Sequence, residues 1–130
     1  MPDIGTPEWA ALLGDLWPGL PDAPGTEGTV SLAVAVAPRR EVAVHWTYRQ
    51  GRVITGGTGP GDSPVLALSL GAVDAAEVLS GRVEPSVAFM RGRLKAAGEG
   101  SVLLAFLAST ATDAFEKWRA QAEAVGARPA

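Results

Sequence analysis

The sequence predicts an α+β fold, in which one five-stranded, mostly antiparallel sheet carries helices packed on one face. Three observations predict it. Apolar residues alternate with a period of two between residues 29 and 71, which is typical of half-buried strands. They recur with helical spacing before residue 18 and after residue 74. Strands and helices are therefore segregated along the chain, and segregation favours a sheet with its helices on one side.

Residues 1–28 are predicted to form one amphipathic helix followed by a loop. Thr6, Pro7 and Glu8 place a capping hydroxyl, a proline and an acidic residue where a helix begins. We expect the helix to continue to Pro18. The apolar positions within it have helical spacing and predict a face that packs on the sheet: Trp9, Leu12, Leu13, Leu16 and Trp17.

Four strands are predicted within residues 29–71. Residues 29–37 and 41–49 both alternate and are separated by a short turn, so they form an antiparallel pair. A third strand is expected at residues 52–55, after a tight turn. A fourth is expected at residues 64–70, where three leucines share one face.

Residues 74–130 are predicted to hold the remaining helices and the fifth strand. Asp74 and Glu77 resemble a capping box, which opens a short helix. A second short helix is expected over residues 84–90, because a proline follows its first residue. The fifth strand is expected over residues 93–97, where the chain re-enters the sheet beside an earlier strand in a parallel pairing.

The end of the chain is predicted to be a long helical segment. Residues 102–108 are apolar on nearly every side, so this part should be buried or should line a cavity. Asp113 and Glu116 can cap a separate helix, which predicts a bend at residues 109–112. The whole chain, residues 1–130, is predicted to be one domain, because a split would leave two weak cores.

Composition and charge exclude several classes of function. The net charge of −3 argues against nucleic acid as a partner, since a duplex-binding protein normally carries a basic face. The chain has no cysteine, which excludes a disulfide scaffold, thiol catalysis and cysteine-based zinc sites. The first twenty residues lack a signal-peptide pattern, and the longest apolar run is too short to span a bilayer. We therefore expect a cytoplasmic protein whose membrane contact is at most transient.

Signals for catalysis and metal binding are weak. His45 is the only histidine, it falls on the polar face of its strand, and a zinc site would need further ligands. No Gly-x-Ser-x-Gly elbow occurs. The glycine-rich residues 56–63 lack the lysine of a phosphate-binding loop and precede a strand, so we expect a flexible loop there. These observations predict no catalytic residue, no metal and no cofactor.

Three short motifs carry a family resemblance: DAAEVLSG at residues 74–81, EP at residues 84–85 and AFMRGRLK at residues 88–95, followed by Gly98. They resemble the sterol carrier protein 2 domain, closely over residues 64–107 and loosely over most of the chain. Two departures stand out. Glu99 follows Gly98 where the family commonly has Asp, and the sequence DSP at residues 62–64 replaces an Ala-Asp pair.

The resemblance implies a five-stranded sheet covered by helices, with an apolar tunnel between them that holds fatty acyl chains, acyl-CoA, sterols or phospholipids. The protein would then be a non-enzymatic lipid carrier. The residues that could form the tunnel wall, or could equally be ordinary core, are Trp46, Phe89, Met90, Leu103, Phe106, Leu107, Phe115 and Trp118. Arg91, Arg93 and Lys95 could pair with an anionic head group or approach an anionic membrane, and they could equally form a solvated edge.

Two further functions stay open on the sequence. The same fold with a filled cavity would be an accessory interaction module, acting through a protein partner or as a homodimer. An enzyme acting on a bound hydrophobic substrate is the weaker alternative, because no paired acid and base can be recognised.

Overall fold

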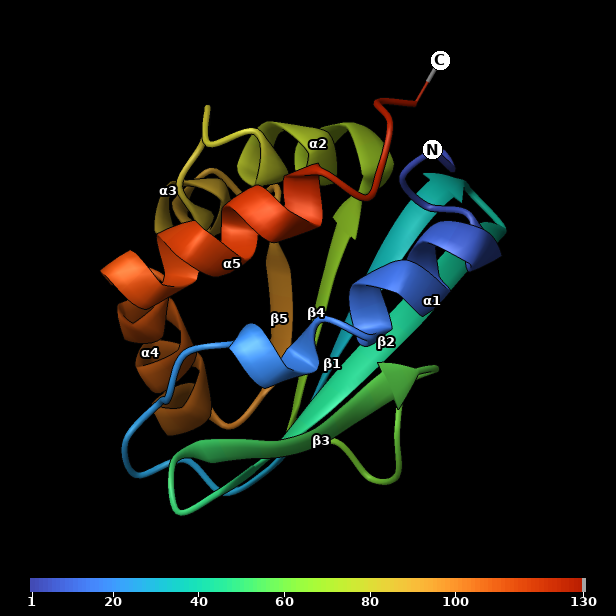
Figure 1. The fold of residues 1–130 in the computed structure, drawn as a ribbon. Coiled ribbons are helices and arrows are strands. Elements are labelled where there is room, and N and C mark those ends of the chain that lie inside the picture. The colour runs from blue at the N-terminus through green and yellow to red at the C-terminus, as the bar shows by residue number, and fades with distance from the viewer. Residues whose placement is uncertain (130) are drawn as a thin grey trace.

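The computed structural model describes residues 1–129, and it confirms the predicted fold class (Figure 1). One five-stranded sheet has the strand order β3-β2-β1-β4-β5. The strands are β1 Gly28–Ala37, β2 Arg40–Arg49, β3 Arg52–Thr58, β4 Leu66–Gly71 and β5 Lys95–Gly98. All neighbouring strands pair antiparallel except β1 and β4, which pair parallel.

The helices lie over one face of this sheet, the face toward the viewer in Figure 1. They are α1 Pro7–Gly14, a short 3-10 helix Trp17–Gly19, α2 Ala72–Leu79, α3 Pro85–Met90, α4 Gly100–Ser109 and α5 Asp113–Glu123. Helix α1 packs on β2 and β3, and α2 packs on β1 and β4. No helix within residues 1–129 is both long enough and apolar enough to cross a membrane.

The parallel pairing predicted for the fifth strand is wrong. β5 runs antiparallel to β4, with Leu66 opposite Gly98. Helices α2 and α3 both lie at the end where β4 stops (Figure 1), so the chain re-enters the sheet in the opposite direction. The parallel pair instead joins β1 to β4, with Val30 opposite Leu66, because β2, β3 and a loop lie between them in the chain.

The first helix begins as predicted and ends early. The Thr6 side chain accepts a hydrogen bond from the Trp9 backbone N–H. The helix ends at Gly14, with Asp15 as its C-cap. Gly14 packs closely on β3, since an added Cβ there would lie 3.0 Å from the backbone of Gly57. The predicted end at Pro18 is therefore wrong. The chain then turns through the 3-10 helix, which places Trp17 over β3.

The predicted loop over residues 56–63 is also wrong in its first part, because β3 continues through Gly56 and Gly57 to Thr58. Gly56 pairs with Trp46 of β2, and a Cβ at Gly56 would lie 2.6 Å from the Cβ of Trp17. The glycine therefore makes room for a tryptophan on the helical face of the sheet.

Two further boundaries differ from the prediction. Helix α2 begins at Ala72 with Gly71 at its N-cap and no side-chain cap, so Asp74 lies inside the first turn and forms no capping box. β5 begins at Lys95, because the backbone N–H groups of Arg93 and Leu94 both donate to the Ala88 carbonyl oxygen in the turn after α3.

The predicted bend between the last two helices is confirmed. Its cap is Thr112, whose hydroxyl accepts a hydrogen bond of 3.2 Å from the Phe115 backbone N–H. The expectation that residues 102–108 are buried or line a cavity on every side is wrong. Val102 and Phe106 face the core, but Leu104 is 70% exposed, because only one side of α4 has a packing partner.

Candidate functional site

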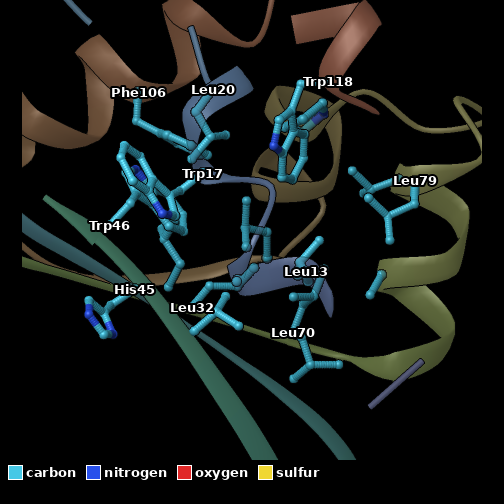
Figure 2. Close-up of a pocket in the computed structure, with 18 of the residues that line it drawn as sticks. Leu13, Trp17, Leu20, Leu32, His45, Trp46, Leu70, Leu79, Phe106 and Trp118 are labelled. Carbon is cyan, nitrogen blue, oxygen red and sulfur yellow. The ribbon is translucent and has the colours of Figure 1, made fainter. Parts of the chain in front are cut away.

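An apolar cavity lies between the sheet and the helices (Figure 2). Its volume is about 90 Å³, taken as the space open to the centre of a water-sized sphere. The strands β1, β2 and β4 supply its floor, and α1, α2, α4 and α5 supply its walls. Every secondary-structure layer of the domain therefore contributes to this one hollow.

The partial exposure of Leu32 shows that the cavity lies within the hydrophobic core. It lies at the middle of the central strand β1, between Val44 of β2 and Leu68 of β4. Val30 and Val34, on the same face of the same strand, are 0% and 1% exposed. Leu32 is only half-buried. A central position that is less buried than its neighbours on both sides is explained by the space above it.

The wall is almost entirely apolar, because it consists of the inward face of the strands and the apolar faces of the helices. Among the residues that line it, none presents a charged side chain to the cavity. His45 takes part through its position on β2, but strand alternation turns its imidazole to the other side of the sheet (Figure 2). There its Nδ1 lies 3.0 Å from the carbonyl oxygen of Gly59.

Aromatic side chains stand at both ends of the cavity. Trp46 and Phe106 pack with ring centroids 5.8 Å apart at one end, next to Trp17 (Figure 2). Phe115 and Trp118 pack 5.7 Å apart at the α5 end. The Trp118 indole N–H donates to the Leu16 carbonyl oxygen at 3.0 Å, which joins α5 to the segment after α1. These bulky groups define the length of the space.

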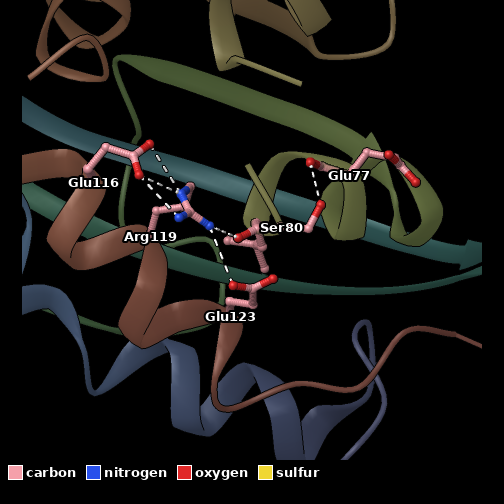
Figure 3. Close-up of polar contacts among 6 residues, drawn as sticks. Glu77, Ser80, Glu116, Arg119 and Glu123 are labelled. Carbon is pink, nitrogen blue, oxygen red and sulfur yellow. Dashed lines mark hydrogen bonds and ion pairs between the residues drawn. The ribbon is translucent and has the colours of Figure 1, made fainter. Parts of the chain in front are cut away.

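Arg119 joins α5 to α2 (Figure 3). Its guanidinium donates to the carbonyl oxygen of Leu79 at the end of α2, and it pairs with Glu116 and Glu123 on its own helix. The hydrogen bond to Glu116 is the main cause that raises the pKa of Arg119. The side chain is 15% exposed and stays cationic, so this clamp persists over the whole physiological pH range.

Four of the eight predicted wall residues line the cavity. Trp46, Phe106, Phe115 and Trp118 lie on it. Met90 does not, since it is 84% exposed on the outer side of α3. The other three pack partly buried against the core without lining the cavity: Phe89, Leu103 and Leu107. The sequence prediction missed Leu32 and the wall residues of α1, which the periodic apolar faces of β1 and α1 mark only as core.

The three predicted head-group residues lie away from the cavity. Arg91 and Arg93 line a separate groove between α2 and α3, together with the carboxylates of Asp74 and Glu77. Lys95 lines a shallow hollow that includes Ser69, its register partner on β4. The structure thus brings the two arginines together and separates all three cations from the apolar wall.

Other chemistry is sparse within residues 1–129. No group of three or more His, Asp or Glu side chains stands close enough to hold a metal ion. Burial raises the pKa of Tyr48, which follows Trp46 on the inward face of β2. A hydrogen bond with the Trp46 side chain opposes this shift, and the Asp22 carboxylate adds to it. The Arg128 guanidinium, 2.7 Å from Glu77, lowers the pKa of that exposed carboxyl.

No protein-family model matches the chain, and no curated protein sequence matches it. Solved structures do. A conserved hypothetical protein from Thermus thermophilus, described as possibly a sterol carrier protein, superposes with a TM-score of 0.65 at 25% identity, covering 98% of this chain and 93% of that chain. The crystal structure of sterol carrier protein 2 gives a TM-score of 0.64 at 25% identity, with 93% and 98% covered. Palmitated SCP2L2 from Aedes aegypti gives 0.54 at 17% identity, with 79% and 87% covered.

These neighbours agree with the architecture found here, a five-stranded sheet with one parallel pair and helices over one face. The chain therefore has the fold of sterol carrier protein 2 domains, the family that its motifs at residues 74–95 resemble.

Proposed function

We propose that this protein is a small, non-enzymatic carrier that holds one hydrophobic ligand, a fatty acyl chain or another lipid, in the cavity beneath its helices. The observation that carries the proposal is the cavity itself, an apolar hollow at the centre of a domain that could otherwise have packed solid. The fold it shares with sterol carrier protein 2 supports the same function.

The size of the hollow favours a thin chain. Its volume of about 90 Å³ is about six to nine times the roughly 10–15 Å³ that one water-sized group occupies. A methylene is of similar size, so about six to nine methylenes fit without rearrangement. Their transfer from water contributes about 5–7 kcal/mol before the cost of ordering the ligand. We expect longer chains to extend toward the surface, and we expect rigid ring systems such as sterols to require the helices to move apart.

The ligand would contact the aromatic pairs at the two ends of the cavity, Trp46 with Phe106 and Phe115 with Trp118. The other four predicted wall residues would contact only a part of the ligand that lies outside the cavity: Phe89, Met90, Leu103 and Leu107. The alternative of an interaction module with a filled interior is less well supported, because Leu32 at the sheet centre lacks the cover that a filled core would give it.

The proposal is tested by solvent extraction of the freshly purified protein followed by mass spectrometry, together with displacement of a fluorescent fatty-acid analogue. We expect a co-purified lipid and saturable displacement at micromolar concentrations. The proposal fails if no lipid co-purifies and no displacement occurs at tens of micromolar. Circular dichroism of the same sample shows that the protein tested is folded.

A further inference from the structure

The cover of the cavity includes one segment that is not firmly packed. Residues 15–20, which follow α1, lie in front of the sheet between α1 and α5 (Figure 1), and we call them the lid. Trp17 and Leu20 of the lid line the cavity (Figure 2), yet none of residues 15–20 is buried. Each α-helix, in contrast, contributes a buried residue to the wall: Leu13, Ala75, Pro85, Phe106 and Phe115. The lid is therefore the most loosely packed part of the wall.

Both ends of the lid are anchored. Gly14, the last residue of α1, is buried and lies close to the backbone of Gly57 in β3. At the other end, Pro21 and Ala23 are buried, and the Ala23 backbone N–H donates to the Gly51 carbonyl oxygen at 2.8 Å. These anchors make the lid a short connection whose motion need not displace α1 or the sheet.

Two contacts hold the lid against the rest of the domain. The Trp118 indole N–H donates to the Leu16 carbonyl oxygen at 3.0 Å, and among residues 1–129 this is the one hydrogen bond between the lid and a distant element. Trp17 lies against Gly56 of β3, where an added Cβ would lie 2.6 Å from the Trp17 Cβ. One neutral hydrogen bond and one apolar contact are a small part of the stability of a domain, so opening the lid costs far less than unfolding.

We infer that the lid is the entrance of the cavity, and that the ligand enters and leaves when residues 15–20 move away from α5. The inference rests on the proposed function and adds the route that the ligand takes. Opening breaks the hydrogen bond from Trp118 to Leu16 and uncovers the apolar wall beneath Trp17 and Leu20. Closing restores both, which keeps the closed state dominant. Because the ligand crosses the same barrier in both directions, the lid sets the rates of binding and release and leaves the affinity unchanged.

The first test ties the lid to α5 with a reversible cross-link. Gly19 and Gln121 are exposed and do not line the cavity, and a Cβ added at Gly19 would lie 3.6 Å from the side-chain oxygen of Gln121. In the double variant with Gly19→Cys and Gln121→Cys, ethanediyl bismethanethiosulfonate joins the two thiols through a disulfide at each end, and mass spectrometry confirms the link. The chain has no cysteine of its own, so a reductant removes only this link.

Binding of cis-parinaric acid, a thin fluorescent fatty acid, is followed by stopped-flow mixing. We expect the link to slow association and dissociation by the same factor, about tenfold or more, while Kd stays within about twofold. Reduction should restore both rates. The reduced double variant is the matched control, because it carries the same substitutions and lacks only the link.

The second test needs no ligand. Exchange of the Trp118 indole hydrogen with solvent is measured in proton–nitrogen spectra at increasing urea concentration, beside the slowest backbone amides of β1 and β2. Local opening exposes little surface, so the exchange rate of the indole should depend only weakly on urea, whereas exchange through global unfolding follows the steep dependence of the strand amides. An indole with that steep dependence would mean that the lid opens only when the domain unfolds, which overturns the inference.

The outcomes separate this inference from the proposed function. If cis-parinaric acid binds and the link leaves both rates unchanged, the ligand enters elsewhere and the inference is overturned, while lipid binding stands. If both rates fall and reduction restores them, the lid is the entrance. If cis-parinaric acid does not bind at tens of micromolar, the proposed function fails, and this inference fails with it.

Discussion

The substitution Ala75→Leu should lower ligand affinity without lowering folding stability, and it therefore distinguishes a cavity residue from an ordinary core residue. Ala75 lies on α2, is 5% exposed and forms part of the cavity wall. Leucine adds three carbons, which take up the room of about three of the six to nine methylenes that fit. At about 0.8 kcal/mol for each lost methylene, a ligand that fills the cavity should lose about 2.4 kcal/mol, or about 60-fold in affinity. Folding stability should hold or rise, because the new side chain fills a void.

Ala76→Leu provides the comparison within the same helix. Ala76 is 2% exposed, but it does not line the cavity, and the substitution changes helix propensity by the same small amount. Overpacking there should cost about 1–3 kcal/mol of stability while leaving the affinity of the folded protein nearly unchanged. Urea denaturation measures the free energy of unfolding, and titration with a fluorescent lipid analogue measures affinity. The reasoning is refuted if Ala75→Leu binds lipid as the unmutated protein does, or if it is destabilised as strongly as Ala76→Leu.

Three other substitutions test single contacts of the fold. Thr112→Ala removes the hydroxyl that accepts from the Phe115 N–H and should lower the free energy of unfolding by about 1 kcal/mol in urea titrations, whereas Thr112→Ser should restore most of it. Arg119→Met should cost about 1–3 kcal/mol, because the Leu79 carbonyl oxygen loses its charged donor; an unchanged urea midpoint would contradict the clamp. The raised pKa of Tyr48 means that its folded form holds the proton more tightly than the unfolded chain, so stability should fall as the pH rises above about 10, and Tyr48→Phe should reduce this fall in alkaline denaturation series.

The strands were predictable because their burial is decided by local alternation. β1 and β2 each lie within one residue of the predicted spans, since each places every second side chain in the core. The end of β3 was harder to predict. Gly56 and Gly57 lack side chains, so no alternation marks them, and only the pairing with β2 extends β3 that far.

The position of the hollow could not be predicted, because it depends on where the helices leave space. The sequence around Leu104 looks uniformly buried, yet that side chain is exposed, since no element packs on the outer side of α4. Conversely, Leu32 looks like any core residue of a strand, and only its neighbours in space reveal that it faces a cavity. The hydrophobic pattern predicts which side chains are buried, but it says little about how closely those side chains pack against one another.

The positions of the three basic residues relative to the cavity were also not predictable from their spacing in the sequence. The motif at residues 88–95 sets three cations close together in sequence, and the prediction left open whether they pair with an anionic head group or form a solvated edge. In the structure the turn after α3 separates Lys95 from Arg91 and Arg93, and the two arginines face the carboxylates of Asp74 and Glu77 across a groove. Proximity along the chain therefore did not become proximity to the apolar wall.

Under the proposed carrier function, the protein should depend on its bound ligand for part of its stability. The wall of an empty apolar cavity forfeits the contacts that a packed core would supply, and a chain lying against Leu32 and Trp46 restores them. Ligand present at a hundred times its dissociation constant adds about 2.7 kcal/mol to the free energy of unfolding, a large share of the roughly 5–15 kcal/mol typical of a domain. The lipid is then both the cargo and the missing part of the hydrophobic core, so release of the ligand and loosening of the helices over the sheet should occur together.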